Sequence, residues 1–325
     1  MRYPFKNYIY KYDLMMNNKF FVVYGHKLYS HTHSYIHYGF IKAFSEYGWN
    51  TIWIDNTDKN INIPSGTLFL TEGQVDDGIP IREDCYYILH NVKENKYANV
   101  PKSNKLILQV QLFGKLYDGS DKIWISDVSL FSPSQNCLYT CWATDLLPNE
   151  INIKEALENI KKQEKSVVFI GSINNCERFG NLNQILPFIS KAKDNNYKLI
   201  CNKDPFKHPI DNDSIKKLIS SCKIAPTILG HWQQNNGYIP CRIFKTISYG
   251  CLGITNSKYV NNISNNICIY HEDSIKLFTL ADDIVGYYPE KVKEILKTQM
   301  EWVKSNHTYI NRIEDILKVF ELKMI

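Results

Sequence analysis

Short runs of apolar residues alternate along the chain with stretches in which apolar residues recur at helical spacing. Residues 19–24 (KFFVVY) form the first apolar run, and a polar loop at residues 25–32 follows it. The next apolar residues return every three or four positions, as on one face of a helix. They are Ile36, Phe40, Ala43, Phe44 and Tyr47. A second apolar run, residues 51–54 (TIWI), completes the pattern of a βαβ unit and predicts a parallel sheet.

The same alternation continues to residue 125 and restarts near residue 166. In the first part, further strands are predicted at residues 67–70, 86–89, 105–110 and 122–125. In the second part, we expect strands at residues 166–170, 198–201, 224–229, 252–255 and 267–270. Helices are predicted there at residues 182–193, 214–221, 240–249 and from residue 273 onward.

The pattern changes between Trp142 and Lys165, where Leu147-Pro148-Asn149 looks like a break and a polar helix follows. We therefore expect two domains, residues 1–150 and 151–325. The predicted fold class is α/β, with two tandem Rossmann-like, doubly wound domains that face a cleft and helices at the C-terminus. In such sheets, ligands bind beyond the carboxyl ends of the strands.

Length and charge agree with this division and exclude one class of partner. A chain of 325 residues is long enough for two domains, and its 44% apolar content allows each domain a core of its own. The net charge of +5 is only mildly basic, and no long basic run occurs, so we expect no nucleic-acid partner. The surplus of positive charge favours binding of an anionic small ligand. It could also attract the protein weakly to an anionic membrane surface, and thus allow peripheral association with it.

The cysteines and the start of the chain favour a cytoplasmic location. Nine cysteines are scattered without a CxxC motif, and several lie in apolar runs, as reduced, buried thiols do. The first 18 residues lack the continuous apolar stretch of a signal peptide, and no apolar run reaches transmembrane length.

The segment of residues 237–256 (GYIPCRIFKTISYGCLGITN) carries the clearest candidate site. Pro240 suits the first turn of a helix, and a helix N-terminus next to a glycine-containing loop attracts anions. Arg242 adds a planar fork for phosphate oxygens, and Lys245 adds a second charge one turn later. These residues could hold a diphosphate. From spacing alone, they fit equally well as solvated charges on an ordinary helix.

Two short motifs resemble known glycosyltransferases. Residues 242–250 (RIFKTISYG) resemble the Arg-x-Phe-Glu-Ala-x-x-x-Gly donor-binding stretch of GT-B glycosyltransferases. Residues 307–312 (HTYINR) resemble the HTYxxR ending of the CgeB/YkvP-like (glycosyl transferases group 1) family. The resemblance covers mainly the second half of the chain.

The resemblance implies that the protein moves a sugar from a nucleotide-diphosphate sugar to a glycan or another hydroxyl acceptor. It implies a donor domain in the second half, an acceptor-side domain in the first half, and no metal or cofactor besides the donor. The implied donor-binding residues are Gly171, Ser172, Tyr238, Arg242 and Lys245.

Lys245 departs from the family pattern. Many retaining members carry a glutamate at this position, which is expected to bind the ribose, and a lysine cannot accept those hydrogen bonds. Either another residue holds the ribose or Lys245 contacts phosphate. The choice between a retaining and an inverting mechanism therefore stays open.

A histidine-rich loop after the first strand offers candidate catalytic bases. His26, His31 and His33 lie in this loop, which in a GT-B fold faces the cleft from the acceptor side. An imidazole titrates near neutrality and can take the proton of an attacking hydroxyl. The helix that begins near Ser34 would keep His31 and His33 neutral, which favours these two over His26. His37, four residues after His33, is expected on the exposed side of that helix.

Three other functions remain as alternatives. A nucleotide-sugar epimerase would need acid and base carboxylates in the cleft, and a non-catalytic sugar- or nucleotide-binding protein would need none. A metal-dependent hydrolase would use the His31/His33 pair, but His90, His208, His231 and His271 do not fall clearly at positions that complete a metal site. Asp76 and Asp77 are expected to form a surface turn. No GxGxxG follows either first strand, which argues against a dehydrogenase.

Overall fold

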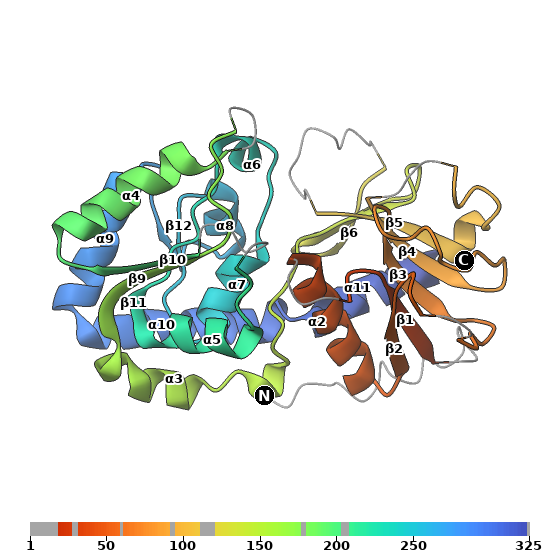
Figure 1. Cartoon of the computed structure of the whole chain (residues 1–325), viewed down its shortest axis with the longest axis horizontal. Coiled ribbons are helices and arrows are strands. Elements are labelled where there is room, and N and C mark those ends of the chain that lie inside the picture. The colour runs from red at the N-terminus through yellow and green to blue at the C-terminus, as the bar shows by residue number, and fades with distance from the viewer. Residues whose placement is uncertain are drawn as a thin grey trace.

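A computed structural model of the chain describes residues 19–27, 32–58, 61–91, 95–110, 121–176, 180–202 and 208–323. Two α/β lobes lie side by side, with the N-terminal half of the chain in one and most of the C-terminal half in the other (Figure 1). This confirms the predicted fold class. No described helix is long and apolar enough to span a membrane.

The first lobe is built on a sheet of eight strands in the order β2-β1-β3-β4-β5-β8-β7-β6. Neighbouring strands from β2 to β8 run parallel, and β7 and β6 add an antiparallel edge. The strand bounds are β1 Phe20–Tyr24, β2 Asn50–Ile54, β3 Leu68–Glu72, β4 Tyr86–His90, β5 Lys105–Gln109, β6 Ile123–Ser126, β7 Ser129–Ser132 and β8 Cys137–Tyr139. The sequence pattern missed β7 and β8, because runs of three or four residues carry little periodicity.

The two faces of this sheet are covered differently. The helices α2 (Thr32–Glu46) and α11 (Tyr309–Leu322) pack side by side on one face and bury Phe40, Phe44 and Ile313 against β1 and β3. The other face buries Ile79, Tyr97 and Val100, which lie in connecting segments rather than in helices. Among the described residues, helices therefore cover this sheet on one face, and connecting segments cover the other.

The second lobe contains two small parallel sheets. One has the order β10-β9-β11, with bounds Lys198–Asn202, Glu164–Ile170 and Cys222–Ile224, and the other pairs β12 (Ile254–Thr255) with β13 (Ile269–Tyr270). An isolated bridge between Thr227 and Thr255 joins them. The strands predicted at residues 224–229, 252–255 and 267–270 are thus shorter than expected. The helices around them are α3 Ile153–Asn159, α4 Leu182–Asp194, α5 Asn212–Ser221, α6 His231–Asn235, α7 Cys241–Ser248, α8 Lys258–Ile263, α9 Ser274–Tyr287 and α10 Pro289–Asn306.

The chain crosses between the lobes twice, and the HTYINR segment lies at the second crossing. Thr308 forms a bridge with Thr144 of the first crossing. The fully buried Arg312 donates to the carbonyl oxygen of Cys141 at 2.7 Å and lies 3.0 Å from Nδ1 of His307. The ring of His307 stacks on Phe244 of α7 at 4.2 Å. These contacts hold both crossings and α7 together.

The last helix returns to the first lobe. Although residues 151–325 were expected to form one domain, α11 contributes Tyr309, Ile316 and Phe320 to the core of the first sheet. The expected division at residue 150 marks the first crossing, and the HTYINR segment marks where the chain comes back.

Candidate functional site

A cavity of about 340 Å³ lies at the carboxyl ends of β9 and β10, next to the start of α7. Its size falls within the range of small-molecule sites. Gly171, Ser172, Tyr238, Arg242 and Lys245 all line it, so the structure brings the five predicted donor-binding residues together. Tyr35 of α2 lines the cavity from the first lobe. The predicted cleft between the lobes is thus present at this point.

Among the residues that the structure describes, Arg242 has no counter-charge. Its guanidinium lies over the ring of Phe169 at 4.6 Å, and among the described residues it has neither a hydrogen bond nor an ion pair. Burial lowers the pKa of Arg242 somewhat, but a guanidinium stays charged at neutral pH. Of the described residues that line the cavity, none is acidic. A half-buried charge of this kind needs a partner, so the cavity is suited to an anion.

Gly171 makes room for this guanidinium. A Cβ atom at position 171 would lie 2.0 Å from Nη2 of Arg242, and the backbone φ of +147° is one that other residues rarely adopt. A glycine therefore follows β9 directly, because Arg242 lies against the backbone at this position. Ser172 follows at the rim, where its carbonyl accepts a hydrogen bond from Asn181 at 3.0 Å.

Tyr238 and the first turn of α7 complete this end of the cavity. Pro240 occupies the N-cap position of α7, so the helix begins beside Arg242 with its N–H groups at the cavity. Burial raises the pKa of Tyr238, which keeps its hydroxyl protonated and able to donate a hydrogen bond.

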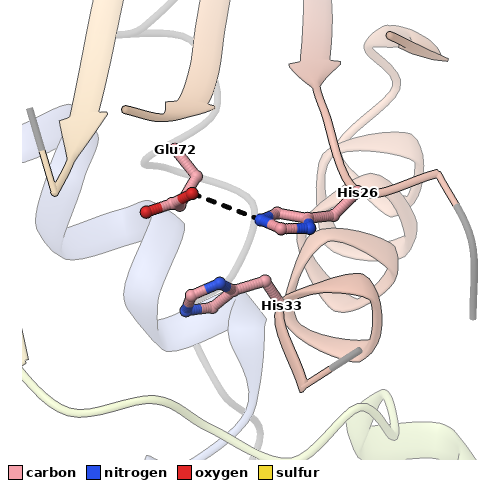
Figure 2. Close-up of side chains that lie close together, drawn as sticks. All are labelled: His26, His33 and Glu72. Atoms are coloured by element: carbon pink, nitrogen blue, oxygen red, sulfur yellow. Dashed lines mark hydrogen bonds and ion pairs between the residues drawn. The ribbon is translucent and has the colours of Figure 1, made fainter. Parts of the chain in front are cut away.

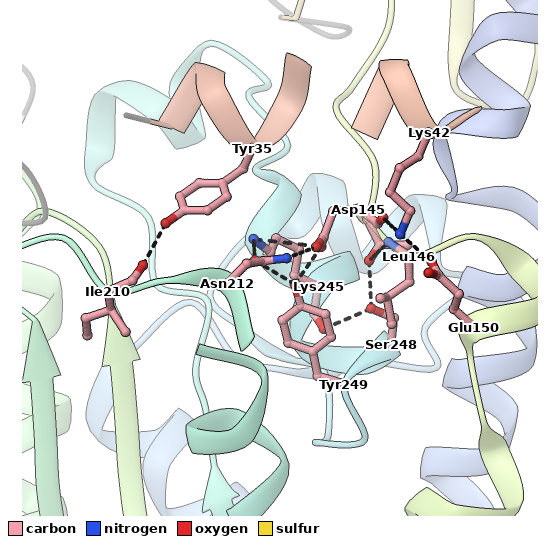
Figure 3. A network of polar contacts seen from close by, with 11 residues as sticks. Tyr35, Lys42, Asp145, Leu146, Glu150, Ile210, Asn212, Lys245, Ser248 and Tyr249 are labelled. Atoms are coloured by element: carbon pink, nitrogen blue, oxygen red, sulfur yellow. Dashed lines mark hydrogen bonds and ion pairs between the residues drawn. The ribbon is translucent and has the colours of Figure 1, made fainter. Parts of the chain in front are cut away.

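Lys245 lines the cavity but already has partners between the lobes (Figure 3). Its ammonium lies 3.2 Å from Oδ1 of Asn212, 3.8 Å from Oδ1 of Asp145 and 4.6 Å from the centre of the Tyr35 ring. Burial would raise the pKa of Asp145, but the Lys245 charge and hydrogen bonds from Tyr249 and Asn212 outweigh it and lower that pKa. Lys245 thus joins the two lobes as well as the cavity.

Two of the three predicted bases lie together in the first lobe, at the carboxyl ends of β1 and β3 (Figure 2). Nε2 of His26 lies 3.2 Å from Oε2 of Glu72, and the rings of His26 and His33 are 5.2 Å apart. His26 has a positive φ of 51°, an unusual conformation for a residue other than glycine and common at functional sites. His31 lies outside the described residues.

Glu72 is a buried carboxylate that the hydrogen bonds around it keep ionised. Burial alone would raise its pKa, but hydrogen bonds from His26, Asn91 and the N–H of Gln74, together with the His33 charge, lower it. A carboxylate held next to an imidazole orients the ring and stabilises its protonated form. His26 and Glu72 are therefore arranged as a general base and the carboxylate that orients it.

The same three side chains could also hold a metal ion. The ligand atoms of His26, His33 and Glu72 lie within 4.8 Å of one another. Two imidazoles and one carboxylate form a ligand set found in catalytic zinc and iron sites.

Comparisons with known proteins agree with the geometry of the second lobe. Residues 157–318 match the sequence profile of a family described as glycosyl transferase-like. This part of the chain therefore resembles glycosyl transferases in sequence. The match includes Gly171, Arg242 and the HTYINR segment. The narrower CgeB/YkvP-like assignment stays a prediction.

The whole chain shares its fold with a solved glycosyltransferase. A crystal structure of a glycosyltransferase from Rickettsia africae ESF-5 superimposes with a TM-score of 0.54, covering 95% of this chain and 99% of that one. At 11% sequence identity, this likeness concerns the fold alone. The sequence has no significant match among curated proteins.

Three expectations about the first lobe were wrong. His37 is buried rather than exposed, its Nδ1 lies 3.1 Å from the carbonyl oxygen of Gly25, and burial lowers its pKa to about 3. His90, which was not expected near a site, ends β4 with its ring 5.3 Å from that of His33. Asp76 is buried and bonded to Lys96 at 2.7 Å and Tyr97 at 2.6 Å, so only Asp77 is exposed as a turn residue would be.

Sequence reasoning also missed residues that shape the site. Glu72 ends the strand predicted at residues 67–70, and a carboxylate at the carboxyl end of a parallel strand was a usable signal. Tyr35, Asp145 and Asn212 gave no such signal. They meet only because the lobes pack together, which no local pattern reports.

Proposed function

We propose that the protein transfers a sugar from a nucleotide-diphosphate sugar to a hydroxyl acceptor, with the donor bound in the cavity next to the start of α7. The observation that carries this proposal is Arg242, a half-buried cation in a cavity whose described lining contains no acidic residue. A diphosphate would supply the missing negative charge. The fold shared with a solved glycosyltransferase supports the same conclusion.

In this proposal, the protein itself neutralises the leaving diphosphate, without a metal ion. Arg242 and the start of α7 face the phosphates, with Lys245 as a second cation and Ser172 and Tyr238 as hydrogen-bond donors. Gly171 lets the guanidinium approach. Preorganised donors and charges of this kind stabilise developing negative charge in a transition state.

The first lobe would activate the acceptor. His26 is the preferred base, because the buried Glu72 at 3.2 Å from Nε2 can hold that nitrogen protonated and stabilise the imidazolium. The proton of the acceptor hydroxyl would then go to Nδ1. His33 is the second candidate, and His31 stays a candidate that lies outside the described residues. The acceptor is a glycan or another hydroxyl compound.

The convergence of His26, His33 and Glu72 supports one rival, a metal-dependent hydrolase. The two functions differ in what a chelator does. We expect EDTA to leave glycosyl transfer unchanged, whereas a hydrolase that depends on a metal at these residues would lose its activity. An epimerase would interconvert two donor sugars without releasing a nucleoside diphosphate.

A direct experiment is to incubate the protein with UDP-, GDP- and dTDP-sugars, with and without a panel of sugar acceptors. Release of the nucleoside diphosphate and the mass of the product would be measured, each with and without EDTA. Binding of UDP, GDP or dTDP should also raise the melting temperature, since a ligand of the native state stabilises it. Absence of both binding and turnover across the panel would refute the proposal.

A further inference from the structure

The first turn of α2 lies between the histidine cluster and the cavity. His33 belongs to this turn and faces His26 and His90, at ring separations of 5.2 and 5.3 Å. Tyr35, two residues later, lines the cavity. Because successive helix residues are turned by about 100°, residues two apart point in nearly opposite directions. One helical turn thus touches both candidate parts of the active site (Figures 2 and 3).

Tyr35 makes the contacts with the second lobe. Its hydroxyl donates a hydrogen bond to the carbonyl oxygen of Ile210 at 2.7 Å. The ammonium of Lys245 lies over the Tyr35 ring, 4.6 Å from the ring centre. Among the described residues that line the cavity, Tyr35 is the one from the first lobe. Its position therefore depends on the loop before α5 and on Lys245, both of which border the space that the donor would occupy.

We propose that Tyr35 is a positioning residue, through which a nucleotide in the cavity sets the placement of His33. This inference rests on the proposed function, because it needs the nucleotide to bind beside Tyr35. A bound diphosphate attracts Lys245 away from Asp145 and Asn212 and so changes what packs on the Tyr35 ring. The first turn of a helix moves as a unit, since His33 and Tyr35 are only about 3 Å apart along its axis.

This arrangement would give the transferase a means to order its steps. The acceptor side is brought into its working geometry when the donor is present, which limits wasteful reaction of an unoccupied site. Among the described residues, Tyr35 forms no hydrogen bond or ring contact with His26 or Glu72, so it acts through α2 rather than as a base.

The test follows the His33 ring by NMR in protein labelled with ¹³C-histidine, using UDP as the probe. The His33 signal is identified by its loss in the variant His33→Gln. We expect UDP to shift this signal in the wild type, to shift it much less in Tyr35→Ala, and to have an intermediate effect in Tyr35→Phe, which keeps the ring and loses the hydroxyl. Affinity for UDP, measured by calorimetry, should stay within about tenfold, as expected for loss of one contact.

Tyr38→Ala is the matched control, because Tyr38 lies on the same helix and does not line the cavity. It should respond to UDP as the wild type does. An unchanged UDP-induced shift of His33 in both Tyr35 variants would overturn the inference, as would UDP binding in the wild type without any His33 shift. If the wild type binds no nucleoside diphosphate at all, the proposed function itself fails, and the inference fails with it. Should Tyr35→Ala not fold, Tyr35→Phe alone decides.

Discussion

At the residue scale, the position of the Arg242 side chain depends on the glycine at position 171. A larger residue there would occupy the space of the guanidinium. The guanidinium rests on Phe169 without an acidic partner among the described residues. Most buried arginines in proteins are paired with an acidic group, whereas the Arg242 side chain lines a cavity. The site is therefore arranged before a ligand arrives, which reduces the cost of binding.

Replacing Arg242 by Ala should weaken UDP binding far more than uridine binding. A charge-assisted contact contributes about 1.5–3 kcal/mol, so the dissociation constant for UDP should rise by about 10- to 150-fold. Uridine lacks the phosphates, and its affinity should barely change. Calorimetric titration of both ligands into both proteins measures this. Equal losses for uridine and UDP would show that Arg242 does not contact phosphate.

The variant Gly171→Ala should lose nucleotide binding, and Gly48→Ala provides its matched control. Both glycines have a positive φ, +147° and +75°, so both variants should be less stable by about 1 kcal/mol. Only at position 171 does the new Cβ meet Arg242, whereas at position 48 no described residue other than the two chain neighbours has an atom within 4 Å. We thus expect loss of UDP affinity in Gly171→Ala alone. Wild-type affinity in that variant would disprove the tight fit between Gly171 and Arg242.

Loss of the catalytic base should reduce turnover without reducing donor affinity. For His26→Ala or Glu72→Gln, we expect the kcat of sugar transfer to fall by about 10²–10⁴-fold, the usual contribution of a general base. UDP affinity should change little, because neither residue lines the cavity. His208→Ala, an exposed histidine in the second lobe, is the control. Full activity in the variants of His26, His31 and His33 would indicate that the leaving phosphate takes the proton.

At the scale of elements, the sequence predicted most strands and helices of the described chain to within a few residues, because buried strands and amphipathic helices carry strong periodicity. The failures have local causes. The strands β7 and β8 are three or four residues long, and the strand expected at residues 224–229 pairs only through Cys222–Ile224 and Thr227. The return of α11 to the first sheet depends on tertiary packing, which the pattern of a single helix cannot report.

The HTYINR segment has a structural role at this scale, and Arg312 is its centre. The guanidinium is fully buried and bonded to Cys141 and His307, so Arg312→Met leaves these acceptors without a partner. We expect the free energy of unfolding to fall by about 3 kcal/mol, as for other buried charged groups that lose their contacts. Urea denaturation followed by tryptophan fluorescence would measure it, with the exposed Lys297→Ala as control. A loss no larger than the control's would exclude this role.

At the scale of the whole molecule, stability should depend on buried neutral histidines. Burial lowers the pKa of His37 to about 3 and of His90 to about 4, and it holds the pKa of His307 well below its usual range. In the unfolded chain, a histidine titrates near pH 6.5. Below that pH the unfolded state binds protons that the folded state does not, so the free energy of unfolding falls as the pH falls. Their stabilising contribution is complete above about pH 6.5.

Each of these histidines should lower the free energy of unfolding by about 1.4 kcal/mol for every pH unit below pH 6.5, until the pH reaches its pKa in the folded protein. Urea unfolding at pH 7.5, 6.0 and 5.0 therefore should give a steep decline over the lower interval. The variant His307→Phe keeps a ring stacked on Phe244 but removes one titrating group. It should be less stable than the wild type at pH 7.5, but its free energy of unfolding should fall less steeply with decreasing pH, by the contribution of about one proton. The exposed His208→Gln should keep the wild-type slope. An unchanged slope in His307→Phe would mean that the folded protein protonates this histidine without penalty, contrary to its burial between Phe244, Trp302 and Arg312.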